Sequence, residues 1–455
     1  MRLALLLTLP LQAGPPPALA IENVTVVPMD REAVEADRTV VVRDGKIVAL
    51  GPAGAVAVPE DARRIDGRGR FLMPGLSDMH VHVWDENDLF LFVACGVTTV
   101  RNLYGDPLHL DWRARIERGE LVGPRIYTAG PIIDGKPAVW PGSVELTDPD
   151  EAAAVVAAQK EAGYDFLKPY ARLSRECYEA LVIAGAEQGL ALMGHVPEAL
   201  ALADVLEAGQ RTVEHLGGWA EAAQRAGSPF ARVDFTSEAR AWQEVDEARL
   251  PHLAAECAVA ETWNCPTLVV LAKWAKGEAA EQLLARPEMR YVSPGTKAAW
   301  LPGGTVNYLT SLPQAAVDAA NASVPRMQRV LPHLREAWRA RGAGGLLLGT
   351  DMGNPYVVAG FALHEELAYF VAAGLSPYEA LRAGTADAAR CMGAEDEWGT
   401  LAIGRRADLL LLAGNPLEDV AHARTPLGVV LRGRWFPAEE LQAELERRAR
   451  AFESR

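Results

Sequence analysis

The 455-residue sequence contains only five cysteines, and they are scattered along the chain. Their number is odd and no Cys-x-x-Cys pair occurs, so they do not form a disulfide framework. Only Cys257 and Cys265 are close enough in sequence to suggest a bridge, and we do not predict one. The five positions are Cys95, Cys177, Cys257, Cys265 and Cys391.

The sequence also lacks a block of basic residues, an internal repeat and a low-complexity segment. Its formal net charge is −15, which argues against nucleic acid as a partner. With 49% hydrophobic and 23% charged residues, the chain has the composition of a globular protein. Its length suits one large domain together with a smaller one.

An apolar run long enough to cross a bilayer is missing as well, since residues 3–9 are too few for that. This run follows Met1-Arg2 and precedes Ala18-Leu19-Ala20, an order typical of a secretory signal peptide cleaved before Ile21. We therefore expect residues 1–20 to be a signal peptide and the protein to be periplasmic or secreted. The alternative is an irregular, proline-rich amino terminus.

Residues 21–72 have the pattern of strands and turns, with Asp44-Gly45 as the turn of a hairpin. These strands are too few for a stable sheet, and further strands follow near the other end of the chain. We predict a small β-sandwich-like domain built from residues 21–72 and 396–436. Residues 437–455 are charged and favour a C-terminal helix.

Between these parts, residues 73–395 alternate short apolar strands with helical stretches, a pattern typical of a parallel sheet. Eight strands close a barrel, so the predicted class is α/β with a (β/α)8 TIM barrel. Two long connections, 216–263 and 271–345, are expected to cover the active face. The predicted strands are Gly75–His82, Val97–Asn102, Arg125–Ala129, Asp165–Tyr170, Ala191–His195, Thr212–His215, Asn264–Val270 and Leu346–Thr350.

The first of these strands ends in His80-x-His82, after a break at Pro74-Gly75. Side chains alternate along a strand, so both imidazoles point to the same side. Two adjacent imidazoles suit a transition metal. The alternative is a pair of hydrogen-bonded histidines in the core.

Four more polar residues stand at the carboxyl ends of predicted strands, where barrel enzymes carry their catalytic groups. Each has a structural explanation when taken alone. A histidine can cap a loop, a lysine can extend to water, and an aspartate can cap the next helix. Their repetition on several strands favours one metal site shared with the two histidines. The four are Lys168, His195, His215 and Asp351.

Taken together, these motifs resemble the amidohydrolase superfamily, in its binuclear branch with imidazolonepropionase-like and prolidase-like proteins. The resemblance covers nearly all of the chain after residue 20 except the two long connections, and its last motifs are similar to those of secreted members. The matching segments are Pro74-Gly75 with His80-x-His82, Gly96-Val97-Thr98-Thr99-Val100-Arg101, Asp165-Phe166-x-Lys168, Gly194-His195, Glu214-His215, Gly349-Thr350-Asp351, Gly384-Thr385-Ala386, Gly399-Thr400-Leu401, Gly404-Arg405-Arg406-Ala407-Asp408-Leu409 and Gly414-Asn415-Pro416-Leu417.

The resemblance implies two divalent metal ions. His80 and His82 would bind the more buried ion, and His195 and His215 the more exposed one. Histidine and carboxylate ligands suit zinc best, while manganese, cobalt and iron stay open.

The resemblance also gives roles to Lys168 and Asp351. Lys168 would be carboxylated on its amine and bridge both ions, because an ammonium has no lone pair for a metal and burial favours the neutral amine. Asp351 would bind the first ion and act as general base. It would accept a proton from the hydroxide that bridges the two ions and pass it to the leaving group.

Three residues around the site are candidates for substrate binding, and two of them have a structural alternative. Tyr170 shares a strand face with Lys168 and could orient substrate or pack in the wall. Arg101 could bind a substrate carboxylate or form a salt bridge. Trp140 lies on a loop expected to face the cavity. His109 matches no motif and is expected at the surface.

The predicted function is therefore metal-dependent hydrolysis of a C–N bond in a small amide or dipeptide. The substrate is a small molecule, and a homo-oligomer stays open. Prolidase-like members carry a tyrosine soon after the fifth-strand histidine, whereas His195 is followed by Val196-Pro197-Glu198, so amides other than dipeptides stay open. The alternative is an esterase, lactonase or phosphotriesterase. A non-catalytic binding protein is less consistent with the complete ligand set.

Overall fold

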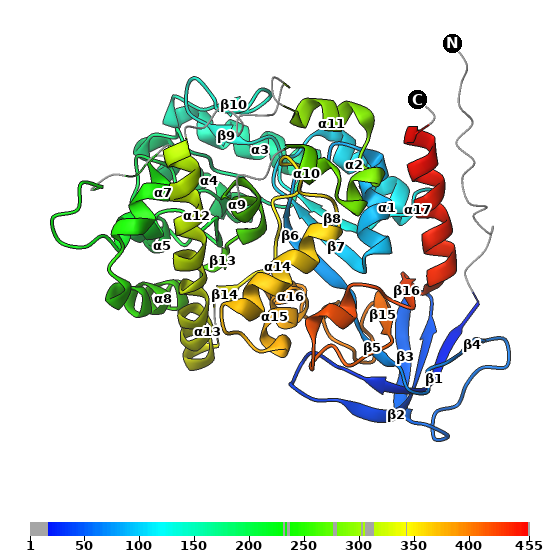
Figure 1. The fold of residues 1–455 in the computed structure, drawn as a ribbon. Coiled ribbons are helices and arrows are strands. Elements are labelled where there is room, and N and C mark those ends of the chain that lie inside the picture. Colours follow the sequence, from blue (N-terminus) through cyan, green and yellow to red (C-terminus); the bar gives the residue numbers. More distant parts are fainter. Residues whose placement is uncertain are drawn as a thin grey trace, which may run out of the picture.

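The computed structural model describes residues 17–453 apart from 231–232, 234–236, 276–279, 302–303, 305–313 and 343. Most of the expected signal peptide, residues 1–16, lies outside the described residues. Figure 1 shows a large helical body around short strands, with a smaller β-sheet below it. Among the described residues we find no helix whose length and apolar content would carry it across a bilayer.

The smaller sheet is built from both ends of the chain. Its strand order is β17-β16-β15-β5-β1-β2-β3, and β4 pairs with β1. Strand β5 joins the two ends, because it runs parallel to β1 and antiparallel to β15. The strands are β1 (Leu19–Val26), β2 (Glu35–Arg43), β3 (Lys46–Pro52), β4 (Arg63–Asp66), β5 (Phe71–Pro74), β15 (Leu409–Leu412), β16 (Gly428–Leu431) and β17 (Arg434–Pro437).

The predicted hairpin turn connects β2 to β3. Asp44 has a φ of 51° and Gly45 a φ of 73°, so both turn residues adopt the left-handed backbone that two-residue hairpin turns require. Strand β1 begins at Leu19, two residues before the expected mature terminus. Leu19 and Ala20 are buried in the sheet, where they pair with β2.

The described part of the body contains three parallel sheets. The two larger ones have the orders β6-β7-β8 and β11-β12-β13-β14, and the third is the short pair β9 (Ile133–Asp134) and β10 (Val144–Glu145). Isolated parallel bridges lie between the two larger sheets, at Ala129 with Phe166, Leu167 with Leu192, and Val81 with Met352. The strands are β6 (Leu76–Val81), β7 (Val97–Asn102), β8 (Arg125–Thr128), β11 (Met193–Gly194), β12 (Thr212–Glu214), β13 (Trp263–Cys265) and β14 (Gly345–Leu346).

The described residues thus do not form the single closed ladder that the prediction of a (β/α)8 barrel implies. The predicted strand Asp165–Tyr170 contributes isolated bridges only. Pro169 lies within it and has no backbone N–H to continue a ladder. The strands before and after this segment, β8 and β11, lie within the predicted ranges.

The predicted strand Asn264–Val270 ends early, because helix α9 (Leu268–Ala275) begins inside it. The buried carboxylate of Glu366 accepts hydrogen bonds from the backbone N–H groups of Leu268 and Val269 at 2.9 and 2.6 Å. These are the first free N–H groups of α9, so a side chain 97 residues away along the chain caps the helix.

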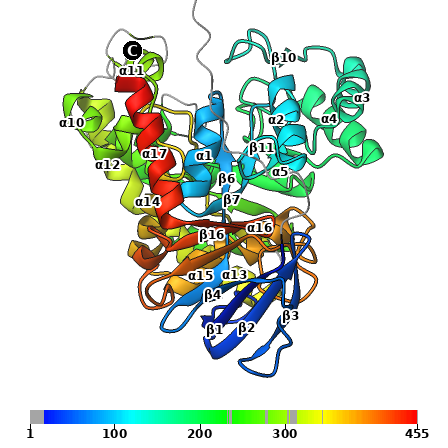
Figure 2. The same cartoon turned by 90° about the vertical axis from the view of Figure 1, so that its right-hand side faces the viewer.

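Helices surround the parallel strands, and α17 packs alongside α1 (Figure 2). The helices before the first long connection are α1 (Glu86–Ala94), α2 (Pro107–Glu117), α3 (Ala152–Ala162), α4 (Arg175–Gln188) and α5 (Leu202–Glu207). The helices after the second are α14 (Phe361–Ala372), α15 (Pro377–Ala383), α16 (Ala386–Cys391) and α17 (Ala438–Glu453).

The two long connections are largely helical and pack on each other through α8 with α13. Part of the second lies beside the start of α1 and the loop that follows β14. Tyr356 donates to the carbonyl oxygen of Trp300 at 2.9 Å, and Asn87 donates to that of Tyr291 at 3.1 Å. Their helices are α6 (Trp219–Ala222), α7 (Glu238–Ala241), α8 (Leu250–Val259), α10 (Ala280–Leu284), α11 (Pro294–Trp300), α12 (Gln314–Gln328) and α13 (Val330–Arg341).

Candidate metal centre

Three strand ends bring His80, His215 and Asp351 together. One potential ligand atom from each lies within 4.8 Å of the others. Oδ1 of Asp351 lies 3.0 Å from Nε2 of His82 and 3.4 Å from Nε2 of His80. Ligand atoms around a tetrahedral ion with bonds of about 2.0 Å lie roughly 3.3 Å apart. The spacing of these atoms therefore fits a shared cation.

The remaining two predicted ligands adjoin this group. The rings of His195 and His215 have centroids 4.8 Å apart. The Tyr170 ring lies 4.2 Å from that of His195, between centroids, and Nζ of Lys168 lies 5.9 Å from the Tyr170 ring. Lys168 is fully buried.

Four buried nitrogen atoms of these side chains make no hydrogen bond to any described part of the chain. A buried polar atom left without a partner costs about 1–3 kcal/mol, so such atoms are rare in native proteins. A metal ion beside Asp351 would satisfy Nε2 of His80, and a carboxyl group on the lysine would replace its unpaired amine. The four atoms are Nε2 of His80, Nδ1 of His82, Nζ of Lys168 and Nδ1 of His195.

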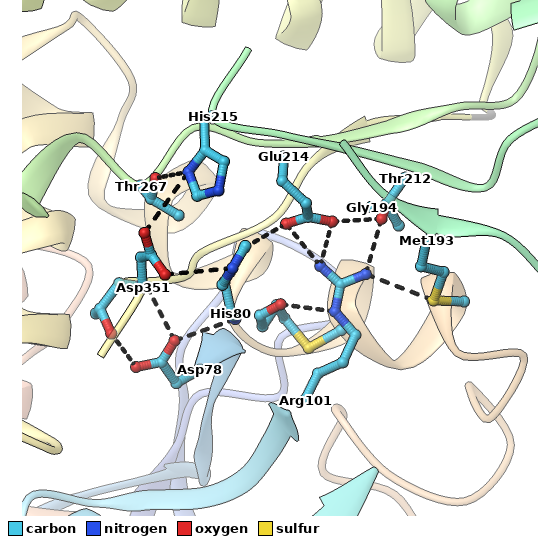
Figure 3. Close-up of polar contacts among 12 residues, drawn as sticks. Asp78, His80, Arg101, Met193, Gly194, Thr212, Glu214, His215, Thr267 and Asp351 are labelled. Atoms are coloured by element: carbon cyan, nitrogen blue, oxygen red, sulfur yellow. Dashed lines mark hydrogen bonds and ion pairs between the residues drawn. The ribbon is translucent and has the colours of Figure 1, made fainter. Parts of the chain in front are cut away.

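The side chains of Glu214, Thr267 and Asp78 form hydrogen bonds that fix the proposed ligands and the turn beside them (Figure 3). Nδ1 of His80 lies 2.7 Å from Oε2 of Glu214, and Nδ1 of His215 lies 2.7 Å from Oγ1 of Thr267. The carboxylate of Asp78 accepts from the backbone N–H of Thr350 at 2.9 Å and from its hydroxyl at 2.6 Å. These contacts connect the strand that carries His80 to the turn that carries Asp351.

Unusual backbone directs these side chains inward. His215 and Asp351 both have a φ of 59°, and Thr267 has a φ of 49°, which is left-handed backbone that residues with a Cβ seldom adopt. Such strain concentrates at functional sites. Gly349 lets the turn approach the first strand, because a Cβ there would lie 2.5 Å from Sγ of Cys265 and 2.8 Å from the backbone N of His80.

The charges of the site follow from its burial. Burial lowers the pKa of Lys168 to about 8, which favours the neutral amine that carboxylation needs. Burial also lowers the pKa of His80 and of His195, so both imidazoles are neutral and have a lone pair for a metal.

Two of the three predicted substrate contacts lie together at the outer edge of this group. Nε1 of Trp140 donates to the hydroxyl of Tyr170 at 2.7 Å. Trp140 lies on the segment between β9 (Ile133–Asp134) and β10 (Val144–Glu145). The hydroxyl of Tyr104 donates to the carbonyl oxygen of Pro141, which ties the same segment down next to Trp140.

Arg101 does not lie at this edge. It is fully buried and its guanidinium binds Glu214, Thr212 and the carbonyl oxygen of Met79. Its position corresponds to the salt-bridge alternative, and the hypothesis that it binds substrate is set aside. The alternation pattern of β7 places Arg101 on the inner face, but a sequence cannot say which acid it meets.

The sequence did not predict the positions of two further residues, Glu214 and His109. Glu214 was part of a motif, yet strand alternation places it on the opposite face from His215. The left-handed backbone at His215 lets both side chains point inward. His109, expected at the surface, is buried. Its Nε2 lies 2.6 Å from the carbonyl oxygen of Val83, the residue after His82.

None of the five cysteines forms a disulfide, and all are buried. Cys257 and Cys265, the one pair whose spacing suggested a bridge, both have free thiols. This agrees with the expectation that the chain has no disulfide framework.

Comparison with known proteins places this fold and site in context. The structure superposes on bottromycin amidohydrolase with a TM-score of 0.77 and 28% identity, over 95% of this chain and 90% of that one. A prolidase-like protein from Bifidobacterium longum gives a TM-score of 0.67 and 25% identity, over 94% of this chain and 99% of that one.

Sequence comparison gives shorter matches. The chain is 43% identical to imidazolonepropionase from Stenotrophomonas maltophilia over 63 residues, which is 13% of this chain and 16% of that protein. It spans only 16–17% of the length of the first curated relatives that it matches. The sequence pattern that defines the Amidohydrolase family, in contrast, matches residues 92–436. The chain therefore belongs to the amidohydrolase family.

Proposed function

We propose that this protein is a metal-dependent hydrolase that cleaves a C–N bond in a small amide or dipeptide. The observation that carries the proposal is the group of buried nitrogen atoms without partners around Asp351. Family membership and the similarity to bottromycin amidohydrolase support hydrolysis of an amide.

The ligand set that we propose is His80, His82, Lys168, His195, His215 and Asp351. Imidazole and carboxylate donors suit two divalent ions, most simply zinc. When bound, such ions polarise a carbonyl oxygen and lower the pKa of water to about 7. Lys168 contributes a carboxylate only after its buried amine has lost a proton, which its lowered pKa favours, and has been carboxylated.

Asp351 is the proposed general base. An aspartate is a carboxylate at neutral pH and can accept a proton from the attacking water. The same group then donates that proton to the departing amine. Tyr170 lies beside His195 with its hydroxyl fixed by Trp140, where it can orient the substrate carbonyl.

The proposed architecture assigns residues 73–395 to a (β/α)8 barrel and residues 21–72 with 396–436 to a β-sandwich-like domain. The tail 437–455 contains α17. Residues 1–20 are the proposed signal peptide, which would direct the protein to the periplasm or the medium. The isolated bridges between the two larger parallel sheets support a barrel.

The proposal is tested by metal analysis and a substrate panel on the full-length protein. We expect close to two zinc ions per chain after loading, and turnover of an amide from a panel of Xaa-Pro dipeptides and N-acyl amino acids. Lactones and paraoxon form the comparison panel. Turnover of the comparison panel alone would replace the amidase proposal by the esterase alternative. Less than one ion per chain and no turnover would favour a binding protein.

A further inference from the structure

The guanidinium of Arg101 reaches across the interior from β7 to β12 (Figure 3). Its Nη2 donates to the two carboxylate oxygens of Glu214 at 2.9 and 3.1 Å, and its Nη1 donates to Oγ1 of Thr212 at 3.0 Å. Its Nε donates to the carbonyl oxygen of Met79 at 2.6 Å. Arg101 and Glu214 are both fully buried, so solvent does not compete for these bonds.

Glu214, held by Arg101, in turn fixes the orientation and protonation of the His80 ring. An arginine keeps its charge in proteins, and a carboxylate beside it can only accept hydrogen bonds. Oε2 of Glu214 lies 2.7 Å from Nδ1 of His80, so Nδ1 carries the hydrogen. The lone pair is then on Nε2, the atom that lies 3.4 Å from Oδ1 of Asp351.

A second set of potential ligands includes the same histidine. Atoms of His80, Glu214 and Cys265 lie within 4.8 Å of one another, and all three residues are buried. Imidazole, carboxylate and thiolate together suit zinc and other ions that bind sulfur. Arg101 binds both oxygens of Glu214 and places a positive charge beside this cluster.

We propose that Arg101 and Glu214 are positioning residues for the metal centre. Glu214 holds His80 with Nε2 toward Asp351, and Arg101 prevents Glu214 from becoming a ligand in the His80–Glu214–Cys265 cluster. The inference rests on the proposed function, because it takes His80 as a metal ligand. Outer hydrogen-bond partners of this kind orient a ligand and raise its basicity.

The first experiment compares cobalt binding by wild type and the double variant R101M/E214Q. Replacing both members of a buried ion pair together leaves no unpaired charge, so the metal-free variant is expected to unfold near the wild-type temperature. We expect its Co²⁺ affinity, measured by competition with a chromogenic chelator, to fall about 10–100-fold. A purely structural pair would leave the affinity of a stably folded variant unchanged.

A matched control removes another ion pair, between Arg382 on α15 and Asp387 on α16. Nε of Arg382 lies 2.9 Å from Oδ1 of Asp387. R382M/D387N should bind Co²⁺ within twofold of wild type. Equal affinity in wild type and R101M/E214Q would overturn this inference alone. Failure of the wild-type protein to bind Co²⁺ would overturn the proposed function as well, so the two failures are distinguishable.

The second experiment tests whether Arg101 keeps metal from the cysteine. In R101M the cluster is free to bind Co²⁺, with release of the thiol proton to the buffer. We expect a thiolate-to-cobalt charge-transfer band in the near ultraviolet, absent from wild type and from R101M/C265S. R101K, which keeps the buried charge and so the fold, should give a weaker band. No band in either R101M or R101K would overturn this role of Arg101.

Discussion

The two halves of the candidate metal centre are held in different ways. The inner half consists of His80 and Asp351 with the buried side chains that support them, Asp78, Arg101 and Glu214. Hydrogen bonds and ion pairs connect these groups across β6, β7 and β12 and the turn after β14. These contacts fix the positions of His80 and Asp351 from the side away from the proposed metal ions.

The outer half consists of Lys168 and His195 with Tyr170 and Trp140. Its contacts are aromatic, apart from the hydrogen bond between Trp140 and Tyr170. Nζ of Lys168 and Nδ1 of His195 make no hydrogen bond within the described ranges. Nε2 of His80 and Oδ1 of Asp351 in the inner half also lack a hydrogen-bond partner among the described residues. The difference therefore indicates that a cation would complete both halves, and that hydrogen bonds preorganise the inner half more strongly than the outer half.

The largest effect is expected from D351N, which removes the negative charge of the inner half. An amide cannot accept the proton, so kcat should fall about 10³-fold on the best amide of the panel. D396N is the matched control, because the side chain of Asp396 is 99% exposed, and it should keep kcat within twofold. Retention of more than a tenth of wild-type kcat in D351N would exclude it as general base.

The next prediction contrasts the halves in the metal-free protein. K168M replaces an unpartnered buried amine by an apolar chain and should raise the free energy of unfolding by about 1–2 kcal/mol. E214A leaves Arg101 buried without its partner and should lower it by roughly 3–5 kcal/mol. Urea unfolding after chelation measures both changes. If the free energy of unfolding changed in the same direction in K168M and E214A, the proposed difference between the two halves would be wrong.

Chelation should also affect the halves unequally in the wild-type protein. Amide hydrogen exchange around His195, whose N–H donates to Pro169 at 3.2 Å, should become about tenfold faster when metal is removed. Exchange at Met79, whose N–H donates to Leu348 at 2.9 Å, should change less than twofold. Equal acceleration at both places would mean that the inner half depends on metal as much as the outer half does.

The sequence was sufficient for the parts that depend on local pattern. His80 lies in β6 and His82 directly after it, and the segments that follow β12 and β14 bring His215 and Asp351 to His80. The hairpin at Asp44-Gly45 followed from its turn residues alone. Each of these depends on neighbours within a few residues.

Contacts between distant segments could not be predicted in the same way. Glu366 ends the predicted strand near Leu268 by capping α9, and no local signal marks it. The burial of Arg101 depends on Glu214, 113 residues further on. The side chain of Glu214 points inward because His215 has left-handed backbone. That backbone conformation cannot be predicted from the sequence, because residues other than glycine seldom adopt it.

The smallest expected effect concerns the aromatic edge of the outer half. The hydroxyl of Tyr170 accepts a hydrogen bond from Trp140, so its own hydrogen is free to donate to a substrate carbonyl. Y170F removes this hydroxyl and should lower kcat/KM about tenfold, which corresponds to the loss of one hydrogen bond. W140F should cost about threefold, because it only loosens that hydroxyl. If Trp140 acts through Tyr170, adding W140F to Y170F costs nothing more. Additive losses in the double variant would instead mean that Trp140 contacts the substrate itself.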